Sequence, residues 1–144
     1  MTIKEYLSQA WRMEERIQAK FERIWRWRSI AEKVTQTYSG MPRDGKRDKA
    51  EILARILDAE RELDKEIDRL IMLQSDIRIT IQSVPDATER MILELRYLNY
   101  MTWEEIGERM ILEVRWLHRL HNRAIKKVIP KTDHRNTHLT YDIV

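Results

Sequence analysis

Apolar side chains recur every three or four residues over two long stretches of the chain, residues 3–38 and 49–82. This spacing places them on one face of an α-helix, so each stretch predicts a long helix. Polar residues such as Lys20 and Glu60 interrupt the two stripes only at isolated places. The first stripe comprises Ile3, Tyr6, Ala10, Met13, Ile17, Ile24, Trp27, Ala31, Val34 and Tyr38, and the second Leu53, Ile56, Leu63, Ile67, Leu70, Ile77 and Ile81.

The segment between the two stretches, SGMPRDGKR, contains Gly40, Pro42 and Gly45 and predicts a turn. Two long apolar-striped helices joined by a short turn fold back on each other, which predicts an antiparallel hairpin over residues 1–84. Four apolar residues beside the stripes are expected to widen its buried face: Leu7, Phe21, Leu57 and Ile71.

Trp11 and Trp25 lie two heptads apart beside the first stripe. They either widen the core face of the hairpin or form a surface for self-association or for a partner, because tryptophan is enriched at interfaces.

After Pro85 the pattern changes to three shorter helices. Helix starts are also marked by a short polar residue followed three residues later by Glu, which is the capping-box pattern. The four pairs with this pattern are Thr2 and Glu5, Asp48 and Glu51, Asp86 and Glu89, and Thr102 and Glu105. The inward positions predicted for the three short helices are Met91, Ile92, Leu95 and Leu98, then Ile106 and Met110, then Leu112, Leu117, Leu120, Ala124 and Val128.

The last two short helices are separated by about three residues, which is the helix-turn-helix pattern. Such a motif requires a small residue in the middle of its first helix, where the two helices cross closely. Gly107 occupies that place, and a glycine inside a helix costs roughly 1 kcal/mol, so a packing reason is expected. The alternative is a small helical bundle that tolerates a glycine.

Positive charge is concentrated in one segment near the end of the chain. The net charge of +3 is small, but residues 113–131 carry six basic side chains against the single acidic Glu113. This segment is where an anionic partner is expected to bind.

Other chemistry is not expected. The chain has no cysteine, and its carboxylates lie in helical charge patterns without a conspicuous base; no nucleotide-binding or hydrolase motif occurs, so we predict no enzyme and no cofactor. The pairs His118 with His121 and His134 with His138 have ligand spacing, but we predict no metal site because the first pair lies in a basic helix. Neither a membrane span nor a signal peptide is visible, so a cytoplasmic protein is expected.

The segment RMILELRYLNYMTWEEIGERM followed by LHRLHNRAIKKV resembles region 4 of sigma-70-type factors. The whole chain resembles the ArpU/RinA-like late-gene regulators of phages and prophages. The motifs that carry this second resemblance are a KEYLxQA start (Lys4 to Ala10), an MPR loop (Met41 to Arg43) and an RLH helix (Arg119 to His121). The resemblance implies a DNA-binding transcription regulator without catalytic chemistry, in the cytoplasm of a bacterial host cell.

Two residues depart from the region 4 pattern. The turn usually has glycine where this chain has Ile111, which favours a different turn or a helix that continues through it. Glu113 stands where serine usually opens the recognition helix; it would repel phosphate, although a glutamate also accepts from cytosine N4.

The predicted DNA contacts lie on the outward face of residues 113–127. Arg119 is expected to read guanine and Asn122 adenine. Thr102 and Trp103 are expected to hold a phosphate at the start of the preceding helix. Phosphate contacts are also expected from the remaining basic residues of the segment, Arg115, Arg123, Lys126 and Lys127, and two further outward side chains are Trp116 and His118.

The predicted fold is therefore all-α: a coiled-coil-like antiparallel hairpin (1–84), a sigma-region-4-like helix-turn-helix (85–130) and a flexible tail (131–144). The predicted partners are double-stranded DNA, RNA polymerase and a second copy of the chain, with a dimer favoured since one small reader gives few base contacts. Two alternatives stay open: a small-terminase-like packaging protein, and a protein that binds RNA polymerase without DNA affinity.

Overall fold

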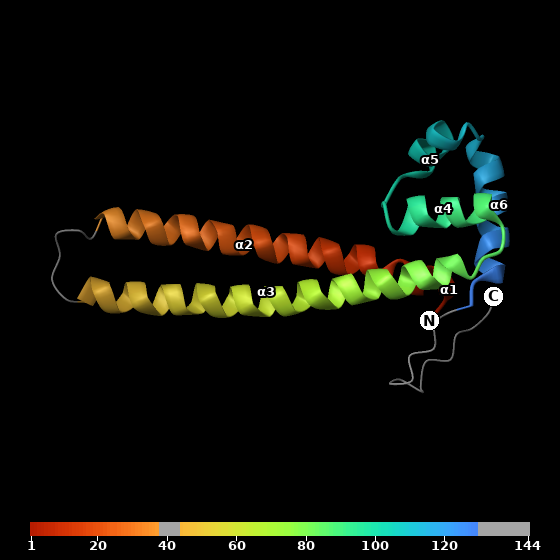
Figure 1. Ribbon diagram of the computed structural model, residues 1–144. Coiled ribbons are helices and arrows are strands. Elements are labelled where there is room, and N and C mark those ends of the chain that lie inside the picture. The colour runs from red at the N-terminus through yellow and green to blue at the C-terminus, as the bar shows by residue number, and fades with distance from the viewer. Residues whose placement is uncertain (38–43, 130–144) are drawn as a thin grey trace. The chain divides into compact units, whose positions relative to one another are not determined.

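The computed structural model describes the backbone of residues 1–37 and 44–129 and the side chains of residues 1–33 and 49–129. Within these ranges the chain forms six α-helices and no strand, which confirms the all-α class. The first part of the predicted turn, with Gly40 and Pro42, the histidine pair His134 and His138 and the tail 131–144 lie outside the described residues. The rest of the predicted turn is wrong, because Asp44 to Arg47, including Gly45, are helical. The helices are α1 (Ile3–Leu7), α2 (Gln9–Thr37), α3 (Asp44–Gln82), α4 (Ala87–Tyr97), α5 (Trp103–Met110) and α6 (Val114–Lys127) (Figure 1).

The single helix predicted over residues 3–38 is divided at Ser8 into α1 and α2. The Ser8 hydroxyl donates to the carbonyl of Lys4 at 2.7 Å, and a serine bonded back to a carbonyl four residues earlier bends a helix. The start of α1 follows the prediction, because Thr2 and Glu5 form a complete capping box. The predicted cap at Asp48 is wrong in position, since α3 is already helical from Asp44.

Over residues 14–69, α2 and α3 run antiparallel side by side, as predicted (Figure 1). Their buried side chains come from the predicted stripes: Ile17, Ile24 and Ala31 from α2, and Ile56 and Leu63 from α3. The polar residues that interrupt the stripes pair across the two helices. Lys20 forms an ion pair with Glu66, and Arg28 forms one with Glu60 at 2.6 Å.

Several apolar side chains predicted to be buried are exposed instead. Two packed helices bury only a narrow stripe on each, so the flanking positions remain in solvent. Trp25 is 66% exposed and therefore does not widen the core. The predictions corrected in this way are Phe21, Trp27, Leu53 and Leu57. Ile71 and Met91, predicted to be buried elsewhere in the chain, are exposed as well.

The contacts divide the chain into two compact units. The hairpin unit is Glu14–Arg69; the helix-turn-helix unit combines Met1–Met13 with the described chain from Leu70 on. The Tyr6 and Thr80 hydroxyls lie 3.4 Å apart in this second unit, where Leu7, Ile77 and Ile81 are fully buried. In this division α1 and the end of α3 belong to the same unit as the later helices.

Candidate nucleic-acid interface

Helices α4, α5 and α6 enclose one apolar core within the helix-turn-helix unit. All five of its buried members were predicted from the periodicity, and the half-buried Met101, Trp103, Met110 and Leu112 pack around them. The buried members are Ile92, Leu95, Ile106, Leu117 and Leu120. This core fixes which side of α6 faces inward.

Gly107 lies at the close crossing that the sequence predicted. A Cβ added there would approach the carbonyl oxygen of Leu112 to 2.9 Å and Cδ1 of Leu117 to 3.5 Å. The carbonyl oxygen of Leu112 belongs to the backbone of the turn, so it cannot move aside as a flexible side chain would. The packing reason for a glycine in α5 is therefore confirmed.

The turn between α5 and α6 keeps its left-handed residue although that residue is Ile111. The helix ends at Met110, and Ile111 has φ 55° and ψ 51°, so neither a continued helix nor a different turn forms. The carbonyl of Gly107 accepts from the backbone N–H groups of both Ile111 and Leu112, which closes the helix end. The side chain of Ile111 is 90% exposed.

At the start of α5, Thr102 is engaged in its own capping box. Its hydroxyl accepts from the N–H of Glu105 at 3.2 Å, and the Glu105 carboxylate accepts from the N–H of Thr102 at 2.9 Å. Glu104 and Glu105 also place two negative charges in the first turn. These carboxylates oppose an anion at this helix end, so a phosphate held by Thr102 has little support from the local geometry.

Trp103 is half-buried and packs against other aromatic side chains. Its ring centroid lies 4.6 Å from that of His118 and 4.8 Å from that of His121, and the Arg96 guanidinium lies over it at 4.7 Å. Trp103 therefore joins α5 to α6, which is a different role from the predicted phosphate contact.

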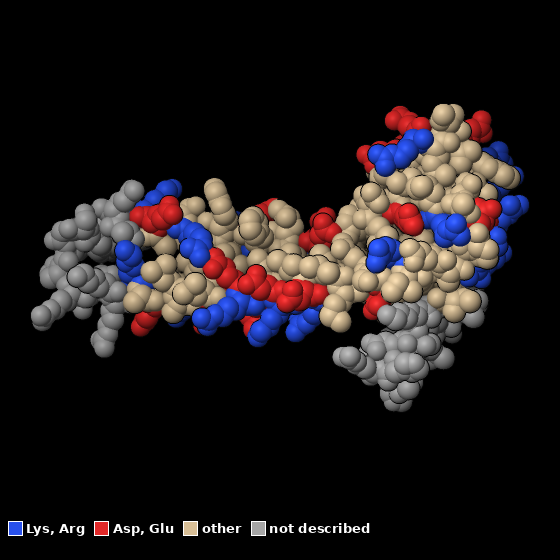
Figure 2. All heavy atoms as spheres, in the orientation of Figure 1, with Lys and Arg blue, Asp and Glu red and all other residues tan. Residues whose placement is uncertain are grey.

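The outward face of α6 carries the predicted contact residues in exposed positions. The Arg123 guanidinium lies 5.9 Å from the ring of Trp116, which is 41% exposed. Blue side chains gather over α6 at the right-hand edge of Figure 2. The exposed members of the predicted set are Arg115, Trp116, His118, Arg119, Asn122, Arg123, Lys126 and Lys127.

Lys127 differs from its neighbours because it has a structural partner. Its ammonium group lies 2.8 Å from the carboxylate of Glu89, which is only 3% exposed. Asp86 caps α4 as predicted by accepting from the N–H of Glu89, while the Glu89 side chain turns to α6 instead of completing the box. Lys127 therefore ties the end of α6 to the start of α4.

A buried hydrogen bond that the sequence did not reveal lies behind the outward face. The Tyr97 hydroxyl and Nε2 of His121 are 2.7 Å apart. Burial, followed by the nearby charge of Lys4, lowers the pKa of His121 to about 4. Burial also raises the pKa of Tyr97 to about 12. Both groups are therefore neutral near pH 7. The only sequence signal was that His121 follows Leu120 and precedes Ala124 on the inward side of α6.

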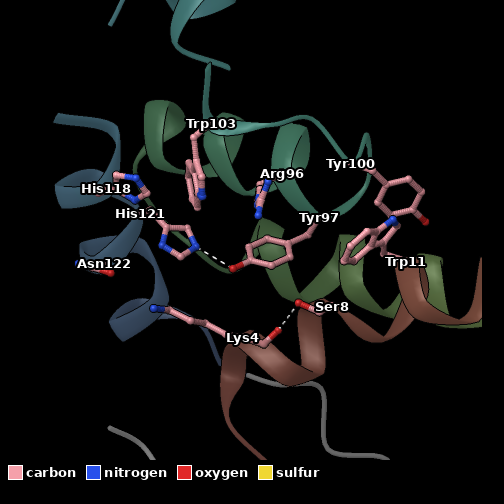
Figure 3. A pocket seen from close by; sticks show the side chains of 10 residues that line it. All are labelled: Lys4, Ser8, Trp11, Arg96, Tyr97, Tyr100, Trp103, His118, His121 and Asn122. Carbon is pink, nitrogen blue, oxygen red and sulfur yellow. Dashed lines mark hydrogen bonds between the residues drawn. The ribbon is translucent and has the colours of Figure 1, made fainter. Parts of the chain in front are cut away.

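A cavity of about 360 Å³ opens beside α6 in the same unit (Figure 3). Lys4 was not predicted to lie here; in Figure 3 its side chain extends from α1 toward Asn122. The cavity brings together three of the predicted contact residues: Trp103, His118 and Asn122. Its other lining residues are Ser8, Trp11, Arg96, Tyr97, Tyr100 and His121.

The residues described contain no group of three metal-ligating side chains. None of the described helices combines the length and the apolar character that crossing a membrane requires.

A short helix that crosses closely over a basic second helix is the arrangement of a helix-turn-helix. In agreement, residues 86–128 match the family model of sigma-70, region 4, which spans α4 to α6. This chain therefore carries a sigma-like DNA-binding helix-turn-helix at its C-terminal side. No curated protein and no solved structure gives a significant match.

Proposed function

We propose that the protein is a sequence-specific transcription regulator of the phage type, with α6 as its recognition helix. The observation that carries this proposal is the exposed basic face of α6 on a domain that matches sigma-70, region 4. The recognition helix of such a domain enters the major groove of DNA, where an α-helix fits.

The roles proposed along α6 follow from exposure. Arg119 reads guanine through O6 and N7, and Asn122 reads adenine. Arg115, Arg123 and Lys126 bind phosphates, whereas Lys127 contributes less because Glu89 already holds it. Lys4 adds a positive charge to the cavity that Asn122 also lines, so α1 supplies a further phosphate contact.

The double variant Arg119→Ala with Lys126→Ala tests this assignment. We expect duplex binding to weaken at least about tenfold and the slope of log K against log salt to become shallower by about 0.9 for each phosphate that is no longer neutralised. A salt titration by fluorescence anisotropy on a labelled duplex measures both quantities.

The matched control is Arg61→Ala with Lys65→Ala, which removes the same charge from exposed positions of α3 in the hairpin unit. Its salt slope should equal that of the unaltered protein. If the slope of log K against log salt were unchanged in the α6 variant, α6 would not be the helix that binds DNA. Selection of bound sites from a random duplex pool then gives the operator, and failure to enrich any motif contradicts sequence-specific binding.

We propose that the hairpin provides the second partner surface, for dimerisation or for RNA polymerase. The two alternative functions give different results. A ring of eight or more subunits by light scattering favours a packaging protein. Capture of RNA polymerase without any duplex binding favours a protein that binds polymerase alone.

A further inference from the structure

The cavity beside α6 collects positive and aromatic side chains from several helices. It lies within the helix-turn-helix unit, since all of its described lining residues belong to that unit. Lys4 comes from α1, Trp11 from α2 and Arg96 from α4. None of the described lining residues is an aspartate or a glutamate. The cavity therefore suits an anionic ligand rather than a cationic one.

The two positive charges of the cavity are not neutralised within the described residues. Neither Lys4 nor Arg96 takes part in the ion pairs found there. Arg96 donates from Nη1 to the carbonyl of Met101 at 2.9 Å and lies over the ring of Trp103, and these contacts hold the guanidinium without removing its charge. Both cations reach His121, whose pKa is lowered first by burial and then by Lys4, with a smaller contribution from Arg96. An anion in this cavity would therefore meet a positive potential.

Two aromatic rings lie at one end of the cavity, those of Trp11 and Tyr100 (Figure 3). Trp11 is 50% exposed, which leaves room for a planar group to stack on its ring. Tyr100 is held by a hydrogen bond that its hydroxyl accepts from Gln74 at 3.0 Å. Its backbone is left-handed, with φ 57°, a conformation that is unfavourable for a residue with a Cβ. Strained residues that their surroundings hold in place are concentrated at functional sites such as ligand clamps.

Hydrogen-bonding side chains lie at the other end. Figure 3 shows Lys4 extending toward Asn122, with His118 on the same side. Ammonium, guanidinium and side-chain amide groups bind phosphate oxygens, whereas planar bases stack on aromatic side chains. A nucleotide combines an anionic phosphate with a planar base, so it is the class of ligand that matches both ends of the cavity.

We infer that this cavity binds one nucleotide, with its base against Trp11 and Tyr100 and its phosphate at Lys4 and Arg96. The volume of about 360 Å³ is within the roughly 300–1,000 Å³ of small-molecule sites. The nucleotide is either a free nucleoside monophosphate or one residue of an unpaired strand. Because Asn122 belongs both to the cavity and to the outward face of α6, the nucleotide competes with duplex DNA, and this consequence alone rests on the proposed function.

Isothermal titration calorimetry on the full chain tests the two-part recognition. If the source is a free nucleotide, at least one of the four common nucleoside monophosphates should bind with a dissociation constant below about 1 mM. The matching nucleoside and ribose 5-phosphate should each bind at least about tenfold more weakly, because each lacks one of the two contacts. Ribose 5-phosphate that bound as tightly as the nucleotide would show an anion site without a base site and overturn the inference.

Two tryptophans of α2 provide a matched pair of variants. Trp11→Leu removes a stacking surface and should raise the dissociation constant of the nucleotide about tenfold. Trp25→Leu makes the same substitution outside the cavity, at a position that is 66% exposed against 50% for Trp11, and should leave the dissociation constant unchanged. Equal effects, with circular dichroism showing both proteins folded, would contradict the inference.

The phosphate end is tested by Lys4→Gln, which removes the charge and keeps a long polar side chain. It should weaken binding of the nucleotide about fivefold and leave binding of the nucleoside unchanged. The control is Arg12→Gln, because Arg12 is exposed in the same unit and does not line the cavity. If Arg12→Gln weakened binding equally, the net charge of the unit rather than the cavity would attract the nucleotide.

A single-stranded oligonucleotide of mixed sequence distinguishes the two sources. Binding of a monophosphate identifies a free nucleotide. Binding of the oligonucleotide alone, weakened about tenfold by Trp11→Leu and not by Trp25→Leu, identifies a nucleotide of an unpaired strand. If no monophosphate binds and Trp11→Leu leaves oligonucleotide binding unchanged, the cavity takes no nucleotide.

Duplex binding is measured on the same protein by fluorescence anisotropy. Saturating nucleotide should raise the dissociation constant of the duplex, and the duplex should raise that of the nucleotide by the same factor. A protein that binds the nucleotide but no duplex refutes the proposed function and leaves the nucleotide site standing. A protein that binds duplex through α6 but no nucleotide refutes the nucleotide site and leaves the proposed function standing.

Discussion

Ile111 is a β-branched residue in a backbone conformation that β-branched residues rarely adopt. Its backbone is left-handed, and a residue with a Cβ pays roughly 1–2 kcal/mol for that conformation. Its side chain is 90% exposed and gains almost nothing from burial in return. The turn forms because Gly107 and the apolar core around it fix both helices, and the local preference of Ile111 is overridden.

We expect Ile111→Gly to raise the free energy of unfolding by about 1 kcal/mol, since glycine adopts positive φ freely but loses more entropy on folding. Urea denaturation followed by circular dichroism measures the change. Ile111→Ala is the control, because it removes the same exposed apolar surface and keeps a Cβ. If alanine stabilised as much as glycine, exposure rather than backbone strain would be the cause.

Gly107 and His121 show how far single residues could be predicted. Gly107 was predictable because a glycine within an amphipathic helix is rare and its cost calls for a packing reason. His121 was not, because a histidine beside Leu120 gives no sign of whether its ring points to solvent or to Tyr97. Only the rotation of α6 against α4 decides this, and periodicity specifies that rotation too coarsely.

At the scale of elements, periodicity and capping residues predicted the short helices closely. Thr102 and Asp86 cap α5 and α4 as predicted, because these caps depend on neighbours within three residues. The division at Ser8 was missed, since a serine in a helical pattern is compatible with both a straight helix and a bent one.

The ion pair between Lys127 and Glu89 is an element-scale contact, because it joins the end of α6 to the start of α4. We expect Lys127→Ala to lower the free energy of unfolding by about 1–2 kcal/mol, because it leaves the buried carboxylate of Glu89 unpaired. The loss is no larger because the ammonium group of Lys127 is partly exposed to solvent. Thermal denaturation measures the loss.

Lys126→Ala is the matched control from the adjacent position. Lys126 is exposed, so its removal should change stability by less than about 0.5 kcal/mol. Equal losses in the two variants would show that the ion pair contributes nothing, and that a general charge effect at the end of α6 is responsible.

For the whole molecule, stability should depend on the protonation of His121. Its pKa is about 4 in the folded chain and 6.5 in the reference state, so the unfolded chain binds more protons between these values. Stability is then fully present above pH 6.5 and falls as the pH decreases toward 4, by up to about 3 kcal/mol. Urea midpoints across this range measure the fall.

His121→Gln should remove this part of the pH dependence, whereas His118→Gln, a substitution at an exposed position of α6, should retain it. Carboxylates titrate near the lower end of the same range in all three proteins, so the difference between variants is the decisive quantity. If stability depended on pH equally in the unaltered protein and in His121→Gln, a group other than His121 would cause the fall in stability.

The two-unit division has a consequence for how the chain is made and modified. The helix-turn-helix unit is discontinuous, so residues 14–69 are an insertion within it rather than a domain that precedes it. On the ribosome, Tyr6 emerges early but cannot meet Thr80 until the whole insertion has been synthesised. A paired change of whole heptads on both helices of the insertion would leave both stretches of the helix-turn-helix unit with their sequence. The helix-turn-helix unit thus depends on two stretches of chain that the insertion separates.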